Sequence, residues 1–323
     1  MKPKKSKRGP KSEPVDPLNR PKGGGKPTEA YKSHYPARVW LIVGGVVMSL
    51  AVLGALLSVL IPLVSQGTQS TTTGPFVPGN KYENLRLTVP LYLYPGGAGL
   101  VAYAEVGKAM AKTEGRTDVI INPNNGEDAV APPSAAFLEG LGLIREEAGT
   151  HFSISSVYGY VYTSYGARDI ELVKAEIDGY ADGWASNVGG IFVDEVHNIE
   201  AQDAYYAELF AYIKGLGLRG IANCGTNPTA AMAVDTNVDR IVTFEGPVGS
   251  WTGFQPSTTQ LTSTDPLRWG MMVLVEESEG EIVTRLDEAI DRNYGNVFVS
   301  NLGVYHIELP TYFGTEVDIL ATG

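Results

Sequence analysis

The sequence predicts a (β/α)8 barrel preceded by a single transmembrane helix. Eight short apolar segments alternate with amphipathic stretches over about 240 residues, which is the pattern of this barrel. Polar residues end several of the apolar segments, and a long uncharged block lies near the N-terminus. Alternation alone does not close a sheet, so a doubly wound open sheet is the alternative fold. The 258 residues after the uncharged block could also accommodate two smaller domains.

The charge of −11 averages two regions of opposite sign. Residues 1–38 hold 11 Lys/Arg and 3 Asp/Glu, residues 39–65 hold no charge, and residues 66–323 hold 14 basic and 33 acidic side chains. The acidic body excludes nucleic-acid binding as the leading function, because a polyanion requires a basic face. Its net charge of −19 would attract a cationic ligand or would simply confer solubility.

The uncharged block, residues 39–64, is long enough to span a bilayer as a helix. A cleavable signal peptide is the alternative, but its apolar part is typically about 7–15 residues long. The basic tail predicts a cytoplasmic N-terminus, a single pass through the cell membrane and an extracytoplasmic C-terminal domain. The predicted regions are a tail without packed structure (1–38), a membrane anchor (39–64), a flexible linker (65–84) and the barrel (85–323). The only cysteine is Cys224, so the chain forms no internal disulfide, and its oligomeric state is left open.

Eight strands and three clear helices can be assigned from hydrophobic periodicity. The predicted strands are Leu85–Tyr94, Asp118–Asn122, Ser153–Thr163, Gly190–Asp194, Gly220–Asn223, Arg240–Glu245, Met271–Glu276 and Asn296–Asn301. The predicted helices are Asp169–Ala185, Ala201–Leu216 and Glu279–Asn293.

Polar residues at the C-terminal ends of five strands predict the position of an active site. Side chains alternate along a strand, so Phe192 shares a face with Asp194, and Thr243 shares a face with Glu245. In a (β/α)8 barrel the active site lies at the carboxyl ends of the strands. The residues expected at this mouth are Asn122, Asp194, Asn223, Glu245 and Asn301.

The acids Asp194, Glu195 and Glu245 are the candidate catalytic residues. Glycoside hydrolysis requires two carboxyl groups across the scissile bond, one as proton donor and the other as nucleophile or base. Acids after a strand can instead cap a helix or pair with an arginine. Because these acids end two apolar strands, we favour catalysis, with Asp194 as nucleophile or, in the reverse order, as acid.

Aromatic residues near the strand ends are candidates for sugar binding. Tyrosine has a flat apolar face and a polar tip, which suit a sugar ring. Tyr94, Tyr160 and Tyr162 are the candidates on strands, whereas Tyr92 and Tyr158 are expected to pack in the core. Trp251 follows the Glu245 strand and is a candidate either for stacking on a sugar or for anchoring a loop.

Two other kinds of site are disfavoured. Gly97–Ala102 fits a loose dinucleotide fingerprint, but the second strand ends in Asn122 and Pro123 rather than in the acid that binds a ribose. Asp194, Glu195 and His197 resemble metal ligands in spacing, yet the chain has only four histidines and no HExxH motif. We therefore expect neither a cofactor nor a metal.

Five segments in order resemble the spherulation-specific family 4, or spherulin-4-like, glycoside hydrolases. They are PLYLYPGG (90–97), VIINPNNG (119–126), VYGYVYTSYGAR (157–168), GIFVDEV (190–196) and IVTFEGP (241–247). The resemblance covers about residues 85–318. It implies a metal-free (β/α)8 barrel that cleaves α-1,4-linked galactosamine or N-acetylgalactosamine polymers in an endo fashion.

The same match implies that Asp194, Glu195 and Glu245 are the essential acids. It also implies that four residues line the groove, namely Asn122, Tyr160, Tyr162 and Asn223. Two departures bear on the substrate: Cys224 stands where the family usually has proline, and the first helix has Ala102 and Tyr103 where a tryptophan is common. The expected function is a membrane-anchored polysaccharide hydrolase. The alternatives are a non-catalytic glycan- or wall-binding barrel and a hydrolase of another polysaccharide.

Overall fold

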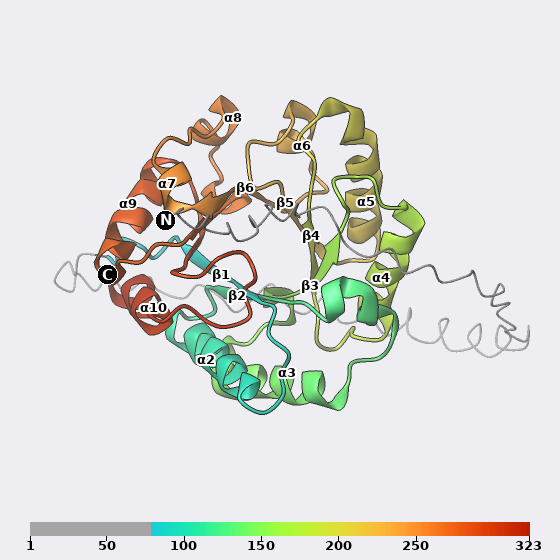
Figure 1. Cartoon of the computed structure of the whole chain (residues 1–323), viewed down its shortest axis with the longest axis horizontal. Coiled ribbons are helices and arrows are strands. Elements are labelled where there is room, and N and C mark those ends of the chain that lie inside the picture. The colour runs from blue at the N-terminus through green and yellow to red at the C-terminus, as the bar shows by residue number, and fades with distance from the viewer. Residues whose placement is uncertain (1–78) are drawn as a thin grey trace, which may run out of the picture. The chain divides into compact units, whose positions relative to one another are not determined.

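The computed structural model describes residues 79–323, which form a closed barrel of eight parallel strands with helices outside it (Figure 1). Neighbouring strands pair in chain order, and β8 pairs with β1 to close the sheet. The strands are β1 (Arg86–Leu91), β2 (Thr117–Ile121), β3 (Val157–Tyr162), β4 (Gly190–Asp194), β5 (Arg219–Asn223), β6 (Arg240–Pro247), β7 (Trp269–Leu274) and β8 (Asn296–Val299). The predicted (β/α)8 barrel is therefore confirmed, and the open sheet and the two-domain alternative are excluded.

The predicted tail, membrane anchor and most of the linker lie outside the described residues. Within residues 79–323, no helix combines the length and the apolar character needed to cross a membrane.

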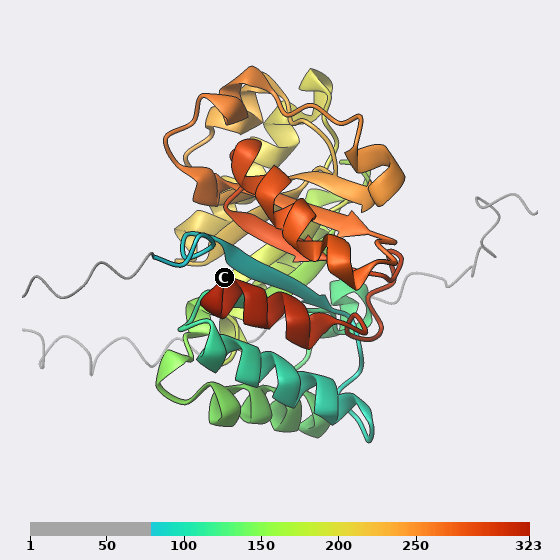
Figure 2. The ribbon, with the colours of Figure 1, turned by 90° about the vertical axis from the view of Figure 1, so that its left-hand side faces the viewer.

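The helices lie outside the barrel, and the longer ones each bury an apolar face. They are α2 (Gly99–Lys112), α3 (Ala135–Ala148), α4 (Ile170–Asp182), α5 (Asp203–Gly215), α6 (Ala230–Val234), α7 (Val248–Trp251), α8 (Thr258–Leu261), α9 (Ile282–Asp291) and α10 (Phe313–Thr322). Figure 2 shows α10 beside α2, and α2 beside α3. In α4 the buried residues Val173, Ile177 and Tyr180 recur at helical spacing, and Asp169 caps the first turn by accepting the Glu171 N–H at 3.0 Å.

The predicted elements are present, with ends that differ from the prediction by up to four residues. The three helices and β3 are shorter than predicted, whereas β5 and β6 are longer. Single 3-10 turns at 200–202 and 279–281 precede α5 and α9, where continuous helix was expected. β1 ends at Leu91 rather than at Tyr94, because the Tyr92 N–H turns to the carbonyl of His306 at 2.9 Å. The residues after β1 thus leave the sheet and join the loops of the barrel mouth.

A β-bulge in β6 determines which side chains reach the mouth. The register with β7 shifts between Val242 and Phe244, so Thr243 is an extra residue. The Thr243 hydroxyl lies 2.8 Å from Gln260 Oε1 and 3.0 Å from the Tyr294 hydroxyl, in the helical layer. Glu245 faces the mouth instead. The expectation that Thr243 and Glu245 share a face is therefore wrong, because simple alternation does not hold across a bulge.

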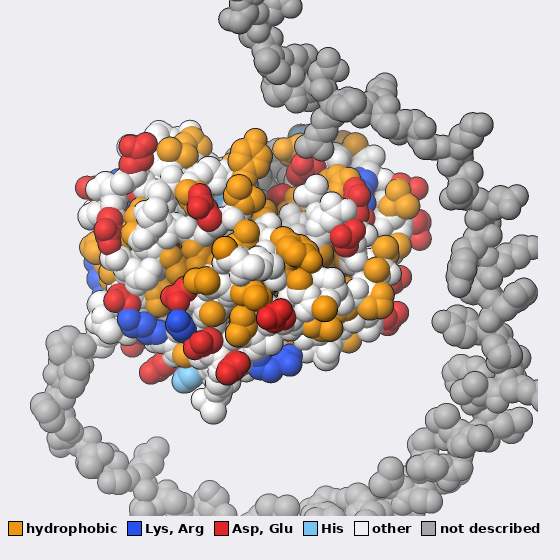
Figure 3. Space-filling model, turned by 60° about the horizontal axis from the view of Figure 1, so that its bottom comes forward, with side chains coloured by type: hydrophobic (Ala, Val, Ile, Leu, Met, Phe, Trp, Pro, Cys, Tyr) orange, Lys and Arg blue, Asp and Glu red, His pale blue; other side chains and the backbone are white. Residues whose placement is uncertain are grey.

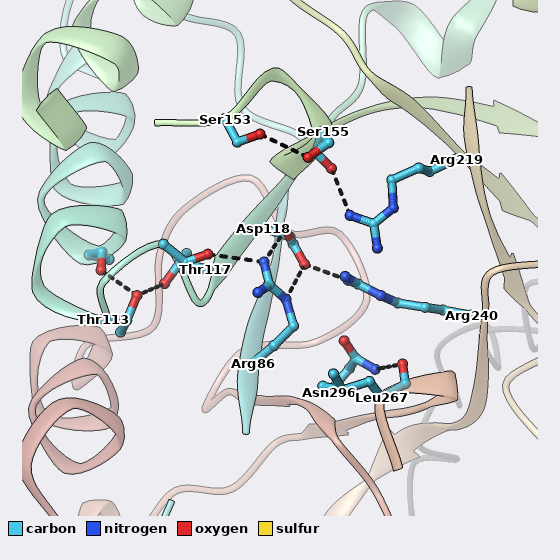
Figure 4. Close-up of polar contacts among 12 residues, drawn as sticks. Arg86, Thr113, Thr117, Asp118, Ser153, Ser155, Arg219, Arg240, Leu267 and Asn296 are labelled. Carbon is cyan, nitrogen blue, oxygen red and sulfur yellow. Dashed lines mark hydrogen bonds and ion pairs between the residues drawn. The ribbon is translucent and has the colours of Figure 1, made fainter. Parts of the chain in front are cut away.

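An ion cluster lies at the opposite, amino end of the strands (Figure 4). The fully buried Asp118 carboxylate accepts hydrogen bonds from Arg86 Nη2 at 2.8 Å and Nε at 3.1 Å, and from Arg240 Nη1. Burial raises the pKa of Asp118, but the charges and hydrogen bonds of Arg240 and Arg86 outweigh burial and leave this pKa below its usual value.

Candidate active site

Three strands bring two carboxyl groups together at the barrel mouth. Asp194 ends β4, Asn223 ends β5, and Glu245 lies beyond the bulge in β6. Asn223 Nδ2 donates to Asp194 Oδ1 at 2.7 Å and to Glu245 Oε2 at 2.5 Å. From β3, the Tyr160 hydroxyl donates to Asp194 Oδ2 at 2.7 Å. Four of the predicted site residues, Asp194, Glu245, Asn223 and Tyr160, therefore form one connected cluster.

The shared donor sets an upper limit on the separation of the two acids. Asp194 Oδ1 and Glu245 Oε2 both bond the same nitrogen, so the bonds of 2.7 and 2.5 Å limit their distance to 5.2 Å. Retaining glycosidases place their carboxyl groups about 5–5.5 Å apart, and inverting enzymes about 6.5–9.5 Å apart. The limit of 5.2 Å between these two oxygens lies below the range of inverting enzymes and therefore favours retention.

The turn after β5 orients the Asn223 amide. Asn223 Oδ1 accepts the N–H of Gly225 at 3.2 Å, which leaves Nδ2 toward the two acids. Gly225 has a φ of +60°, a conformation that glycine adopts without strain. The N–H of Cys224 donates to the carbonyl of Val242 at 3.1 Å, a bond that the proline typical of the family could not make. The departure at Cys224 thus ties the turn to β6.

The surroundings of Asp194 disfavour its ionised form. Burial raises the pKa of Asp194 to about 6, with a further contribution from the nearby Glu245 carboxylate. Hydrogen bonds from Tyr160, the Glu195 backbone and Asn223 oppose this rise by stabilising the carboxylate. The nearby Glu245 charge therefore makes ionisation of Asp194 less favourable.

Glu195 adopts a left-handed backbone conformation, with a φ of +55°. Its carbonyl accepts the Tyr165 N–H and the Thr163 hydroxyl, each at 2.8 Å, and these bonds hold the turn. The turn directs the Glu195 N–H to the Asp194 carboxylate. The Glu195 charge contributes to raising the pKa of Tyr165 after burial, and that of Tyr160 after burial and Asp194.

The remaining predicted binding residues are Tyr162 in β3, Asn122 after β2 and Tyr94 after β1. Asn122 follows β2 and has a buried Oδ1 with no hydrogen-bond partner among the described residues. The Tyr162 hydroxyl donates to Glu127 at 3.4 Å, and the Arg168 guanidinium lies 4.0 Å from the centre of the Tyr162 ring. Tyr94 is 61% exposed and packs edge-on against Phe137.

Trp251 does not line the mouth. It is 0% exposed, packs against Phe244 with ring centres 4.9 Å apart, and donates its indole N–H to Glu288 Oε2 at 2.6 Å. The predicted substrate-binding role is therefore wrong, because a buried ring has no free face. Trp251 instead anchors the loop after β6, which is the alternative role predicted for it.

Two residues at the site were missed from the sequence. Tyr92 was expected in the core, but its ring packs against Tyr160 and His306 at the mouth, with centres 5.2 and 5.3 Å apart. Burial, and then the charges of Asp194 and Glu245, raise the pKa of Tyr92 well above its usual value. His306 comes from the loop after β8, and its Nε2 lies 3.5 Å from Glu245 Oε1. The early end of β1 reorients Tyr92, and no local motif marks His306.

Within residues 79–323, no group of three or more His, Cys, Asp or Glu side chains is arranged to hold a metal ion. The polar contacts of the acid pair come from tyrosine, asparagine, histidine and backbone groups.

Comparison with known proteins identifies the family. Residues 86–320 match the model of the spherulation-specific family 4. The chain belongs to this family. It is 34% identical to spherulin-4 of Physarum polycephalum over 185 residues, which are 55% of this chain and 52% of that protein. The chain therefore spans about half the length of this curated relative, and the resemblance noted in the five segments is confirmed.

A solved structure shows the same fold. The crystal structure of Aspergillus clavatus Sph3 in complex with GalNAc superposes with a TM-score of 0.58. The match covers 74% of this chain and 98% of Sph3, at 20% sequence identity. At this sequence identity the similarity shows a shared barrel fold alone.

Proposed function

We propose that the protein is an endo-acting glycoside hydrolase that cleaves α-1,4-linked galactosamine or N-acetylgalactosamine polymers with retention of configuration. The observation that carries the proposal is the pair of carboxyl groups bridged by the Asn223 amide, with oxygens at most 5.2 Å apart. Family membership and the polar mouth of the barrel support it.

The hydrogen bonds around the two acids indicate which is the nucleophile and which is the proton donor. Both oxygens of Asp194 accept close bonds, from Tyr160 and Asn223, which hold the carboxylate still and favour its charge. We assign Asp194 as the nucleophile that bonds the anomeric carbon. Glu245 Oε1 has no close donor, so this oxygen is free to protonate the departing glycosidic oxygen. Glu245 then removes a proton from the water that hydrolyses the glycosyl–Asp194 ester.

Two observations support an amino-sugar substrate. The related Sph3 was solved with GalNAc. The excess of 33 acidic over 14 basic side chains in residues 66–323 would attract a partly deacetylated, cationic polymer. On the face in Figure 3 the acidic side chains are scattered among apolar and uncharged ones, so this attraction would come from net charge.

We further propose that residues 39–64 anchor the protein in the lipid bilayer with the barrel outside the cell. The support is the 26-residue uncharged stretch with the basic tail before it. Protease added to intact cells should digest the barrel and spare the tail. A barrel that is protected until the cells are lysed would contradict this orientation.

The direct test is hydrolysis of galactosaminogalactan by the full chain, followed by release of reducing ends. Asp194→Asn and Glu245→Gln should each lower kcat by a factor of about 10³ or more. Nuclear magnetic resonance of the first-formed product should show the α-anomer.

Matched controls are Asp182→Asn and Glu146→Gln, which change exposed acids on α4 and α3. Both should retain wild-type rates. Polymer binding without turnover by the wild type would favour the non-catalytic glycan-binding alternative. Turnover of another polysaccharide alone would reject the substrate, and a β-anomeric product would reject retention.

A further inference from the structure

His306 is a buried histidine whose ring nitrogen faces the catalytic pair. It is 3% exposed, and its Nε2 is fully buried with no hydrogen-bond partner within residues 79–323. The nearest acceptor is Glu245 Oε1, at 3.5 Å, just beyond a normal hydrogen bond. A buried polar atom without a partner costs about 1–3 kcal/mol, so the fold retains this nitrogen at a cost.

The loop that carries His306 is built to turn this one side chain inward. Its neighbours Tyr305 and Ile307 are 78% and 61% exposed. His306 has a φ of +47°, a left-handed conformation that is strained for a residue with a side chain. The N–H of Tyr92 holds the His306 carbonyl at 2.9 Å, and the rings of Tyr92 and Phe298 pack against the imidazole with centres 5.3 and 5.9 Å away.

The hydrogen bonds of the acid pair leave one position open. Asp194 Oδ2 bonds Tyr160, and Asp194 Oδ1 and Glu245 Oε2 bond Asn223. Glu245 Oε1 is the remaining oxygen, and His306 Nε2 is the buried donor closest to it.

We propose that His306 is a positioning residue for Glu245: its Nε2–H donates to the Glu245 carboxylate and holds it in line with the glycosidic oxygen. The role rests on the proposed function, because it matters only if Glu245 transfers a proton. The slightly long distance of 3.5 Å lets Oε1 bind either His306 or the leaving oxygen.

The contact itself can be tested without any substrate. Nitrogen-15 spectra of the imidazole groups in the full chain report the state of His306 Nε2, and the spectrum of His306→Phe assigns its signal. Glu245→Gln should shift this signal, whereas the exposed-acid control Glu146→Gln should not. An unchanged signal in Glu245→Gln would overturn the contact, whether or not the protein is a hydrolase.

The catalytic role is tested by comparing two leaving groups. His306→Phe keeps an aromatic ring between Tyr92 and Phe298 but removes the donor, and should lower kcat on the polymer about 10–100-fold with KM unchanged. On an oligosaccharide with a dinitrophenolate leaving group, which departs without a proton, kcat/KM of the same variant reports the first step alone and should stay close to wild type. His306→Gln, which restores an N–H donor, should recover much of the polymer activity.

Controls separate positioning from folding and from the proposed function. His151→Phe changes an exposed histidine and should not alter either rate. Equal losses on both leaving groups, or no recovery with His306→Gln, would reduce His306 to a packing residue and overturn the proposal. If the wild type cleaves neither compound, the proposed function fails, and the spectra alone decide the His306–Glu245 contact.

Discussion

Each end of the barrel holds an aspartate, fully buried at the amino end (Asp118) and half-buried at the carboxyl end (Asp194), and their surroundings shift the two pKa values in opposite directions. At the amino end, Asp118 is paired with Arg86 and Arg240, which hold its pKa below the usual value against the effect of burial. At the carboxyl end, Asp194 lies beside a second acid, and its pKa is raised to about 6 by burial and by Glu245. Tyrosine and asparagine, not cations, contact its oxygens.

The two aspartates therefore have different roles within one sheet: Asp118 stabilises the fold, and Asp194 is available for chemistry. A carboxylate neutralised by two arginines is inert, and it ties three strands together at the amino end of the barrel. A carboxylate held by neutral donors beside another acid can still attack or accept a proton. Burial alone therefore does not identify the catalytic acid, whereas the charge of its partners does.

The largest expected contrast is in stability. Asp118→Asn leaves the buried Arg240 and the half-buried Arg86 without their counter-ion and should lower the free energy of unfolding by about 3–5 kcal/mol. Asp194→Asn removes a charge that the fold disfavours, so at pH 7 it should leave the midpoint of denaturant unfolding unchanged or raise it.

The sign of the Asp194 effect follows from proton linkage. The folded pKa of Asp194, about 6, lies above its ordinary value of 3.8, so the folded state binds more protons between these values and loses stability as the pH rises through them. Urea titrations of both variants at pH 7 measure the contrast. A similar loss of stability in both variants would show that Asp194 is a structural residue like Asp118.

The next effect concerns the bridge between the acids. Asn223→Ala removes two hydrogen bonds to carboxylates, each worth about 1.5–3 kcal/mol, and should lower kcat at least about 10-fold. Asn237→Ala, which changes a half-buried asparagine that does not contact the acids, should keep the wild-type rate. Steady-state kinetics on the polymer measure both, and an Asn223→Ala enzyme with full activity would mean that the bridge is dispensable.

A smaller effect is expected in the pH profile. Asp194 must be ionised to act as nucleophile, so kcat/KM should fall about 10-fold per unit of pH below a limb near pH 6. The Asn223 bond lowers the pKa of Asp194, so this limb should move to higher pH in Asn223→Ala. Profiles from pH 4 to 9 test this, and a limb that does not move would remove Asn223 as a determinant of the Asp194 charge.

The barrel and the acid pair were predictable from local signals, because alternating apolar segments and polar strand ends depend on neighbouring residues. Other features depended on contacts between distant segments. The bulge at Thr243 appears only in the pairing of β6 with β7, and it reverses the face of the next residues. His306 reaches Glu245 from 61 positions along the chain through a turn that no residue pattern marks. The sugar-binding candidate Trp251 failed for the same reason, since its burial depends on Glu288 in α9.

The smallest expected effect is that of changing Trp251. This change tests whether a residue close in sequence to the catalytic strand β6 also takes part in catalysis. Trp251→Phe keeps a buried ring beside Phe244 but loses the bond to Glu288, which still pairs with Arg285 at 2.6 Å. The free energy of unfolding should fall by about 1 kcal/mol, with kcat and KM on the polymer unchanged. Tyr94→Ala, which removes an exposed ring, should instead raise KM and leave the unfolding midpoint in place. A higher KM in Trp251→Phe would mean that the loop after β6 contributes to the sugar site. Burial would then not distinguish stabilising residues from catalytic ones at this edge of the barrel.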